Sequence, residues 1–291
     1  MKKLRVAILG SGNIGTDLLI KIQRSEFLEC VLFIGRNLSS PGMAKAIALG
    51  VKVSDESILA IEKNPDAVDL VFDATSAKDA AHHWAILEKL GKIVVDMTPA
   101  KLGALCIPAV NLHEAVKQRN VNMITCGGQA SIPMAYVIGK TQKEVKYIEV
   151  VSSIASRSAG PATRLNLDEY VDTTEMGISL FSEVKNTKAI LNLNPADPCI
   201  DMQTTIFAQV ENPDMEALTR EVDIMINTIR EYVPGYSLLV SPIYENGRIV
   251  IMVKAQGLGD YLPKYAGNLD IINCAAIAVA EQYSKVQNNL N

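Results

Sequence analysis

The feature that most constrains this chain is a glycine-rich turn near its N-terminus, within the stretch RVAILGSGNIGTDLLIKIQRS. Val6–Leu9 form a continuous apolar run, which is typical of a strand buried on both faces. In the GxGxxG that follows, Gly10 allows a tight turn, Gly12 lets the backbone approach a pyrophosphate, and Gly15 lets helix and strand pack closely. A second apolar run over Cys30–Gly35 completes a βαβ pattern. The context therefore favours a dinucleotide-binding turn over a glycine turn without a ligand.

The next part of the chain continues this alternation of short apolar runs and helix-like stretches. The runs lie at Leu70–Asp73, Ile93–Asp96 and Asn122–Thr125, with helical patterns over 77–90 and 111–119 between them. Such alternation predicts an α/β fold with a Rossmann-type doubly wound parallel sheet. Ligands of these sheets bind beyond the carboxyl ends of the strands, so the polar segments DATS and DMTP are predicted to face the site.

The pattern changes from about Ile132 and predicts an α+β layer. The expected elements are a helix over Pro133–Lys140 with the proline in its first turn, a strand over Tyr147–Ser156, a loop over 156–166, a helix over Asp168–Glu183, strands over Lys188–Asn192 and Met202–Val210, a helix over Met215–Tyr232 and a hairpin at Asn246-Gly247. We therefore expect a dinucleotide-binding domain of residues 1–131, to which a C-terminal helix within 267–291 returns. Residues 132–266 would form a catalytic and dimerisation domain, whose sheet pairs with a second subunit.

Cys126 follows the last of the N-terminal apolar runs and precedes a helical pattern, in TCGGQASIP. A thiol at this edge of the sheet would lie beside the cofactor. The positive end of the following helix is expected to lower its pKa and raise its thiolate fraction. The alternative is a buried structural cysteine, an interpretation we give to Cys30 and Cys274 within their apolar runs.

Composition and charge exclude several classes of function. The formal net charge is −4 and hydrophobic residues make up 48% of the chain, which indicates a globular core and no strongly basic face for nucleic acid or membrane. Five scattered cysteines without a CxxC pair indicate a reduced, cytoplasmic protein. His82, His83 and His113 all precede Cys126. Neither a metal site nor a cysteine–histidine pair from the second domain is therefore predicted.

The residue after the second strand bears on the choice of cofactor. An acidic residue there would bind the ribose 2′-hydroxyl of NAD, but this chain has Arg36-Asn37, followed by Ser39 and Ser40. Arg36 could stack on adenine, pair with the 2′-phosphate of NADP, or extend into solvent. The sequence leaves these three interpretations open.

Seven segments together resemble the acylating acetaldehyde dehydrogenases of aromatic meta-cleavage pathways, namely GSGNIG, IVVDMTPAKLG, NVNMITCGGQASIPM, SRSAGPATRLNLDEY, NLNPADP, YVPGYSL and DYLPKYAGNLDI. The resemblance covers nearly the whole chain, and TCGGQA with YAGNLDI is its most specific part. It implies a Rossmann domain joined to an α+β domain like that of the glyceraldehyde-3-phosphate dehydrogenases. It also implies oxidation of a short aldehyde with NAD and coenzyme A to an acyl-CoA, in the breakdown of aromatic hydrocarbons.

The resemblance also implies roles for individual residues. The cysteine of TCGGQA, Cys126, would carry the acyl group as a thioester, and backbone N–H groups of Cys126, Gly127 and Gly128 would stabilise the oxyanion. The expected cofactor-binding residues come from the glycine motif, from Arg36 after the second strand, and from the resemblance. They are Gly10, Ser11, Gly12, Asn13, Ile14, Gly15, Arg36, Ser158, Ala159, Gly160, Pro161, Ala162, Thr163, Arg164, Leu165, Asn166 and Asn268. A homodimer and a complex with a 4-hydroxy-2-oxovalerate aldolase, which hands over the aldehyde, are the expected assemblies.

Three segments depart from the pattern of that family. Arg36-Asn37 replaces the usual acidic residue, so tolerance of NADP stays open. Met202–Thr205 stands where the family tends to have Met-Arg-Asp-Thr, whose aspartate has been considered a helper of the thiol; that carboxylate is missing here, and Asp201 is at best a displaced substitute. The stretch between YVPGYSL and GLGDYLP is shorter than is typical.

Two other functions fit the same motifs. The first is a semialdehyde dehydrogenase of related fold, which also uses a cysteine but passes the acyl group to phosphate. The second is a dinucleotide-binding sensor in which Cys126 reports the redox state without turnover. An assay that compares coenzyme A with phosphate separates the first from the leading interpretation, and turnover itself separates the second.

Overall fold

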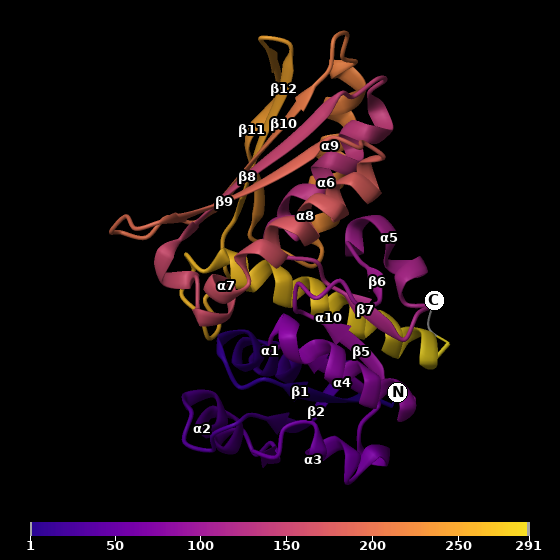
Figure 1. Cartoon of the computed structure of the whole chain (residues 1–291), viewed down its shortest axis with the longest axis vertical. Helices are drawn as coiled ribbons and strands as arrows, with labels where there is room; N and C mark the ends of the chain where they lie inside the picture. Colours follow the sequence, from indigo (N-terminus) through magenta and orange to yellow (C-terminus); the bar gives the residue numbers. More distant parts are fainter. Residues whose placement is uncertain (1, 290–291) are drawn as a thin grey trace.

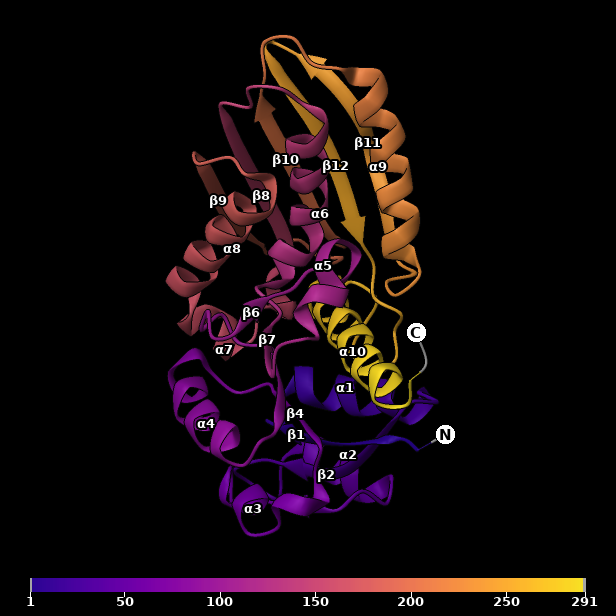
Figure 2. The same ribbon diagram turned by 90° about the vertical axis from the view of Figure 1, so that its right-hand side faces the viewer.

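The computed structural model of the chain describes residues 2–289, apart from the side chains of Pro161 and Ala162. Two β-sheets lie at opposite ends of an elongated molecule, with a long C-terminal helix between them (Figure 1). The first and last described residues lie close together, and the Asn288 side chain donates a hydrogen bond to the carbonyl oxygen of Lys2 (Figure 2). Across residues 2–289, no helix is long and apolar enough to cross a membrane.

The first sheet has seven parallel strands within the described chain, in the order β3-β2-β1-β4-β5-β7-β6. Its strands are β1 (Leu4–Leu9), β2 (Leu28–Ile34), β3 (Val53–Ser54), β4 (Leu70–Asp73), β5 (Ile93–Asp96), β6 (Ala104–Leu105) and β7 (Asn120–Asn122). The accompanying helices are α1 (Asn13–Arg24), α2 (Pro41–Ala48), α3 (Leu59–Glu62), α4 (Ala77–Lys89) and α5 (Pro108–Ala115). The strand order reverses between β1 and β4, where ligands of such sheets bind. The predicted doubly wound α/β fold is confirmed.

The second sheet has five strands within the described chain, in the order β11-β12-β10-β8-β9, and only the β8–β9 pair is parallel. Its strands are β8 (Tyr147–Ala155), β9 (Thr187–Asn194), β10 (Met202–Gln209), β11 (Tyr236–Glu245) and β12 (Arg248–Ala255). Helices α6 (Cys126–Thr141), α8 (Leu167–Ser182) and α9 (Met215–Arg230) cover one face (Figure 2). Buried residues alternate with half-buried ones along β8 and β10, so the two faces of the sheet differ.

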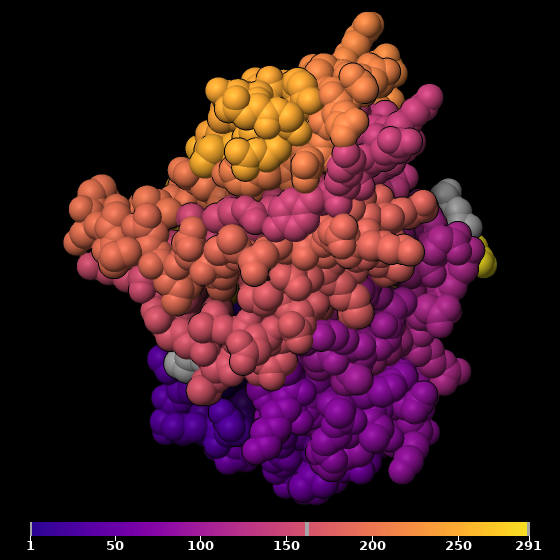
Figure 3. Space-filling view, turned by 45° about the horizontal axis from the view of Figure 1, so that its top comes forward, coloured from indigo at the N-terminus to yellow at the C-terminus, as the bar shows by residue number. Residues whose placement is uncertain are grey.

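Two connections of the second sheet differ in shape. Asn246 and Gly247, at φ 52° and 75°, form the tight turn between β11 and β12 that the sequence predicts. The connection from β9 to β10 instead projects from the body of the molecule (Figure 1, Figure 3).

The C-terminal helix α10 (Gly267–Gln287) packs beside α1 and enters the hydrophobic core of the first sheet through Ile272, Ala276 and Val279. A buried ionic cluster joins the two helices. The ammonium of Lys21 lies 2.9 Å from an oxygen of Asp17 and 2.7 Å from an oxygen of Asp270. Apolar packing and these ion pairs thus hold helix α10 against helix α1.

Three expected boundaries are wrong. The last N-terminal strand ends at Asn122, and helix α6 begins at Cys126 and contains Pro133 in its interior. Residues 127–135 of α6 are all buried, so tertiary packing outweighs the local cost of the proline. The expected loop over 156–166 holds a 3-10 turn, η2 (Ser156–Ser158), and a short helix, α7 (Pro161–Leu165).

Candidate active site

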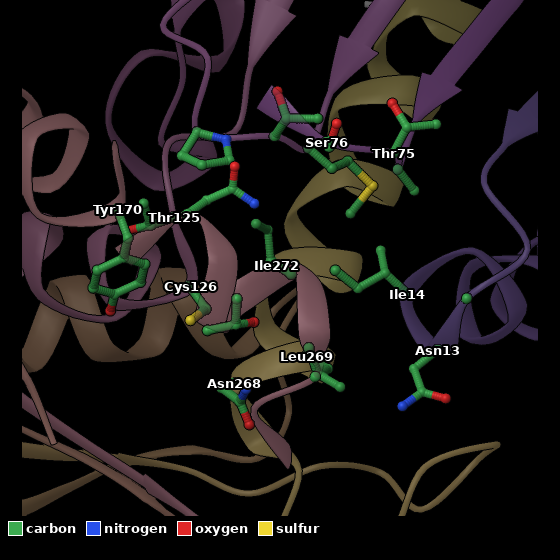
Figure 4. A pocket seen from close by; sticks show the side chains of 18 of the residues that line it. Asn13, Ile14, Thr75, Ser76, Thr125, Cys126, Tyr170, Asn268, Leu269 and Ile272 are labelled. Carbon is green, nitrogen blue, oxygen red and sulfur yellow. The ribbon is translucent and has the colours of Figure 1, made fainter. Parts of the chain in front are cut away.

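A pocket opens where the carboxyl ends of β4 and β5 face the start of α6 (Figure 4). Its cavity volume is about 210 Å³. Its lining comes from the glycine turn, the strand ends, the segment after β8 and the start of α10: Gly12, Asn13, Ile14, Ala74, Thr75, Ser76, Met97, Thr98, Pro99, Ile124, Thr125, Cys126, Ser158, Gly160, Thr163, Asn166, Tyr170, Asn268, Leu269 and Ile272. The fold therefore brings Cys126 and the glycine turn to one cavity.

Helix α1 begins at this pocket with its first-turn N–H groups free of any side-chain cap. Its N-cap is Gly12, and its first turn has no acidic residue. A Cβ at Gly12 would meet no atom within 4 Å, whereas a Cβ at Gly15 would lie 1.9 Å from the carbonyl oxygen of Gly10. The chain itself therefore requires a glycine at position 15, while position 12 faces open space in the pocket.

Helix α6 begins at the same pocket and has a side-chain cap. The Thr125 hydroxyl accepts a hydrogen bond from the N–H of Gly128 at 2.8 Å and lies 2.7 Å from the hydroxyl of Thr174. Because the N–H of Gly128 is used in this way, it is unavailable to an oxyanion, contrary to expectation. The N–H groups of Cys126 and Gly127 are left for that role.

The backbone just before α6 is strained. Ile124 has φ +63°, a left-handed conformation that costs a β-branched residue about 1–3 kcal/mol. The Asn122 side chain compensates, because its Oδ1 accepts a hydrogen bond from the N–H of Ile124 at 2.8 Å. Its Nδ2 donates to Oδ2 of Asp96 and to the carbonyl oxygen of Thr98, both at 2.9 Å. This network sets the direction in which the chain enters α6.

The Cys126 thiol does not have the lowered pKa that its place at a helix start suggested. Burial raises the pKa of Cys126 to about 11, while the nearby Tyr170 hydroxyl and the N–H groups of Gly127 and Cys126 act to lower it. Within the described chain, no charged side chain contributes to this shift. Desolvation therefore outweighs the donors around the sulfur.

Two buried carboxylates, those of Asp73 and Asp96, lie below the rim of the pocket. The ring of His83 contacts Oδ2 of Asp73 through Nδ1 at 2.8 Å, and although burial opposes the charge, Asp73 raises the pKa of His83. Burial, together with the charge of Asp73, raises the pKa of Asp96 to about 7. His82 is exposed, whereas His83 has a carboxylate partner, Asp73, that its sequence context did not reveal.

Eight of the 17 expected cofactor-binding residues line the pocket. The lining includes Gly12, Asn13, Ile14, Ser158, Gly160, Thr163, Asn166 and Asn268. Among the described side chains, the expected residues outside the lining are Gly10, Ser11, Gly15, Arg36, Ala159, Arg164 and Leu165. The side chains of Pro161 and Ala162 lie outside the described residues. Arg36 is exposed just after β2. Asp201 is also outside the lining and accepts a hydrogen bond from Gln256 instead.

Three buried polar atoms at the pocket have no aligned hydrogen-bond partner among the described residues. They are the hydroxyl oxygens of Thr98 and Tyr170 and Oδ1 of Asn268. Unsatisfied buried polar atoms are costly, so a cluster of them at one cavity is typical of a site that a polar ligand completes. Tyr170 was not expected here, because it belongs to no local motif and reaches Cys126 only through the packing of α8 on α6.

Comparison with known proteins matches both halves of the chain to family models. Residues 126–263 match the dimerisation model of prokaryotic acetaldehyde dehydrogenases, and residues 5–118 match the NAD-binding domain of semialdehyde dehydrogenases. An acetaldehyde dehydrogenase of Spirochaeta aurantia is 61% identical over 284 residues, covering 98% of this chain and 96% of the relative. One from Pectobacterium atrosepticum is 58% identical over 288 residues, covering 98% and 97%.

The solved structures extend the likeness to the fold. A crystal structure of an aspartate semialdehyde dehydrogenase with NADP from Candida albicans has a TM-score of 0.67 over 100% of both chains at 13% identity. The expected fold, like that of the glyceraldehyde-3-phosphate dehydrogenases, is thereby confirmed. Sequence identity above one half across nearly the whole length shows that this chain belongs to the acetaldehyde dehydrogenase family of prokaryotes.

Proposed function

We propose that this protein is an acylating aldehyde dehydrogenase that converts acetaldehyde or another short aldehyde, NAD and coenzyme A to the acyl-CoA and NADH. The nucleophile is Cys126, which carries the acyl group as a thioester. The observation that carries this proposal is that Cys126 lines the same cavity as Gly12, Asn13 and Ile14. Oxidation through a covalent thioester requires a nucleophile beside the hydride acceptor.

The residues of the pocket fit a dinucleotide. The uncapped first turn of α1 offers N–H donors and a positive dipole end to a pyrophosphate, and Gly12 leaves the space for it. The unsatisfied Oδ1 of Asn268 offers an acceptor to an amide. We propose that residues 11–14, residues 158–166 and Asn268 hold NAD, which when bound supplies the hydride acceptor.

The protein's own residues perform the covalent steps. The Cys126 thiolate attacks the aldehyde carbon, a C–S bond forms, and the carbonyl electron pair moves to oxygen, where the N–H groups of Cys126 and Gly127 stabilise it. When the C=O bond re-forms and the hydride leaves the carbon, a thioester remains on Cys126. The sulfur of coenzyme A, as its thiolate, then attacks the thioester carbon; the C–S bond to Cys126 breaks, and Cys126 leaves as the thiolate.

The absence of charge in the lining favours a small neutral aldehyde over a charged semialdehyde. All of the described residues that line the pocket are uncharged. A carboxylate-bearing substrate or inorganic phosphate is ordinarily bound by arginine or lysine, through charge-assisted hydrogen bonds. This lining therefore supports acetaldehyde as substrate, and coenzyme A rather than phosphate as the acyl acceptor.

An assay of the purified protein with acetaldehyde and NAD tests the proposal. With coenzyme A present, we expect NADH and acetyl-CoA in equal amounts; with phosphate in its place, we expect no acetyl phosphate. Acetyl phosphate formation would instead identify a phosphorylating enzyme. NAD binding and thiol oxidation without any turnover would identify a redox sensor.

We further propose that NAD is the better cofactor and that NADP is tolerated. The exposed Arg36 stands near the place of an acidic residue that would repel a 2′-phosphate. Ser40, which caps α2, and Ser11 lie close by, with their hydroxyls 3.3 Å apart. These groups can donate hydrogen bonds to either a ribose hydroxyl or a phosphate.

We also propose a homodimer formed through residues 132–266, the catalytic and dimerisation domain, with residues 1–131 and α10 forming the cofactor domain. The uncovered face of the second sheet supports this, because Phe207 lies between Glu149 and Val250, and Thr205 between Val151 and Met252. All are half-buried. The variant Phe207→Lys should be monomeric by analytical ultracentrifugation while the wild type is dimeric; an unchanged dimer would exclude this face.

A complex with a 4-hydroxy-2-oxovalerate aldolase is proposed from the resemblance of the motifs. Such a partner would supply a volatile aldehyde directly to the pocket. Co-expression and co-purification of the two proteins from the same genome, followed by comparison of aldehyde loss to solvent for mixed and separate enzymes, tests it. Separate elution with equal aldehyde loss would contradict the complex.

A further inference from the structure

The surroundings of Cys126 lack the cation that usually stabilises a reactive thiolate. Such thiolates are ordinarily held by a histidine or lysine or by another positive charge. Here burial raises the pKa of Cys126 to about 11, and among the described residues only hydrogen-bond donors oppose it. A neutral donor beside the sulfur must therefore do what a cation does elsewhere.

Tyr170 provides such a donor on helix α8. The residue is 6% exposed and lines the pocket, and its hydroxyl oxygen is buried without an aligned partner in the part of the chain that the structure describes. In Figure 4 its hydroxyl lies next to the sulfur of Cys126, and of the donors that lower the pKa of Cys126, the Tyr170 hydroxyl has the largest effect. Burial raises the pKa of Tyr170 well above its usual value, so it keeps its proton at neutral pH.

The position of the hydroxyl depends on Gly127. A Cβ at that residue would lie 1.9 Å from the Tyr170 oxygen and 3.1 Å from the hydroxyl of Ser152. Any other residue at position 127 would therefore push the hydroxyl away from the start of α6. The glycine next to the nucleophile makes room for this donor.

Hydrogen bonds also fix α8 against the cap of α6. The Thr174 hydroxyl donates to the carbonyl oxygen of Tyr170 at 2.6 Å and lies 2.7 Å from the hydroxyl of Thr125, the N-cap residue of α6. The threonine pair thus joins the two residues, because Thr125 directly precedes Cys126 and Thr174 is bonded to the carbonyl of Tyr170 one helical turn earlier. A preorganised donor loses little entropy when charge develops on the sulfur.

We propose that Tyr170 is a catalytic residue whose hydroxyl donates a hydrogen bond to the sulfur of Cys126 when it becomes a thiolate. This inference rests on the proposed role of Cys126 as the nucleophile. While Cys126 is a protonated thiol, the Tyr170 hydroxyl lies near its sulfur but is not aligned for a hydrogen bond to it. Loss of the proton turns the sulfur into a strong acceptor, and the charge-assisted bond favours the thiolate.

The test is the pH dependence of Cys126 alkylation by iodoacetamide in the full-length protein, followed by peptide mass spectrometry. Tyr170→Phe keeps the ring in the pocket and removes only the hydroxyl. We expect the apparent pKa of Cys126 to rise by about one unit and alkylation at neutral pH to slow about tenfold. The value of kcat/KM for acetaldehyde should fall by a similar factor, with the KM for NAD unchanged.

Tyr236→Phe is the matched control, because the buried Tyr236 hydroxyl donates to the carbonyl oxygen of Ala130, also on α6, at 2.6 Å. It should lower the melting temperature and leave the alkylation profile as in the wild type. Gly127→Ala, which displaces the Tyr170 hydroxyl, should shift the profile in the same direction as Tyr170→Phe and gives a second route to the answer.

An alkylation profile unchanged in both Tyr170→Phe and Gly127→Ala would overturn the role of Tyr170. Because alkylation needs neither aldehyde nor coenzyme A, this result is independent of the proposed reaction. A shifted profile in a protein that makes no acetyl-CoA would refute the reaction but leave the pairing of Tyr170 with the sulfur in place.

Discussion

Helices α1 and α6 begin at the same pocket, yet their first turns are built differently. The N-cap of α1 is Gly12, with no side-chain hydrogen bond, whereas the N-cap of α6 is Thr125, whose hydroxyl binds the N–H of Gly128. Neither first turn contains an acidic residue, so both keep the full positive end of the helix dipole. The difference lies in how many donors each helix leaves free.

The two arrangements suit anions of different size. An uncapped turn with open space before it suits a pyrophosphate, which can engage several N–H groups at once. A capped turn leaves fewer donors, and those of Cys126 and Gly127 face a single sulfur or oxygen. We therefore interpret one helix start as the cofactor cradle and the other as the place where reaction charge develops. The following predictions test that distinction.

Removal of the nucleophile should have the largest effect. Cys126→Ser should lower acyl transfer by more than about 10³-fold, because a serine hydroxyl is a far weaker nucleophile at neutral pH. Dinucleotide affinity, which depends on the start of α1, should stay nearly unchanged in a fluorescence titration. Wild-type protein given aldehyde and NAD without coenzyme A should carry the acyl mass on the Cys126 peptide; an acyl mass on Cys106 or Cys199 would contradict the assignment.

The glycines of α1 should separate binding from stability. Gly12→Val should raise the KM for NAD at least about tenfold, with little change in melting temperature, since its side chain enters open space. Gly15→Val should instead lower the melting temperature, because its Cβ would meet the carbonyl of Gly10 at 1.9 Å. If Gly12→Val folds and binds NAD normally, the start of α1 does not hold the phosphates.

The free energy of unfolding should depend on pH through Asp96, which belongs to the hydrogen-bond network before α6. Its pKa is raised to about 7 in the folded protein, above the usual range, so the folded state binds the extra proton. The resulting stability is present at low pH and is lost as the pH rises toward 7. Between pH 5 and pH 7 the wild type should lose up to about 2 kcal/mol of unfolding free energy more than Asp96→Asn.

Urea titrations at both pH values measure this difference. His83, whose pKa is also raised, contributes a loss of the same sign. Because the charge of Asp96 is one of the causes that raise the pKa of His83, this loss is smaller in Asp96→Asn and adds to the expected difference. Parallel pH profiles for the wild type and Asp96→Asn would show that Asp96 is ionised throughout this range.

The smallest effect should be on cofactor choice. Arg36→Asp should lower kcat/KM for NADP about tenfold, because attraction to the 2′-phosphate becomes repulsion. The value for NAD should change by only a few fold. Measurement of both cofactors with both proteins gives the answer, and an unchanged NADP value would mean that Arg36 extends into solvent.

Local patterns were enough to predict the first sheet, the glycine turn and the hairpin at Asn246-Gly247. Each depends on residues adjacent in sequence, whose backbone preferences act over a few positions. The same reasoning failed for α6, where Pro133 suggested a helix start. That proline lies within residues 127–135 of the helix, all of which are buried, and no local signal reports such burial.

The sequence by itself determined the fold class, the place of Cys126 at the edge of the sheet and the resemblance to an acylating enzyme, because these lie in short, contiguous motifs. Only the tertiary structure decided that Tyr170 lies beside the sulfur, that His83 pairs with Asp73, and that burial raises the thiol pKa. Contacts between helices and strands distant in sequence, and the exclusion of water, follow from how the whole chain packs.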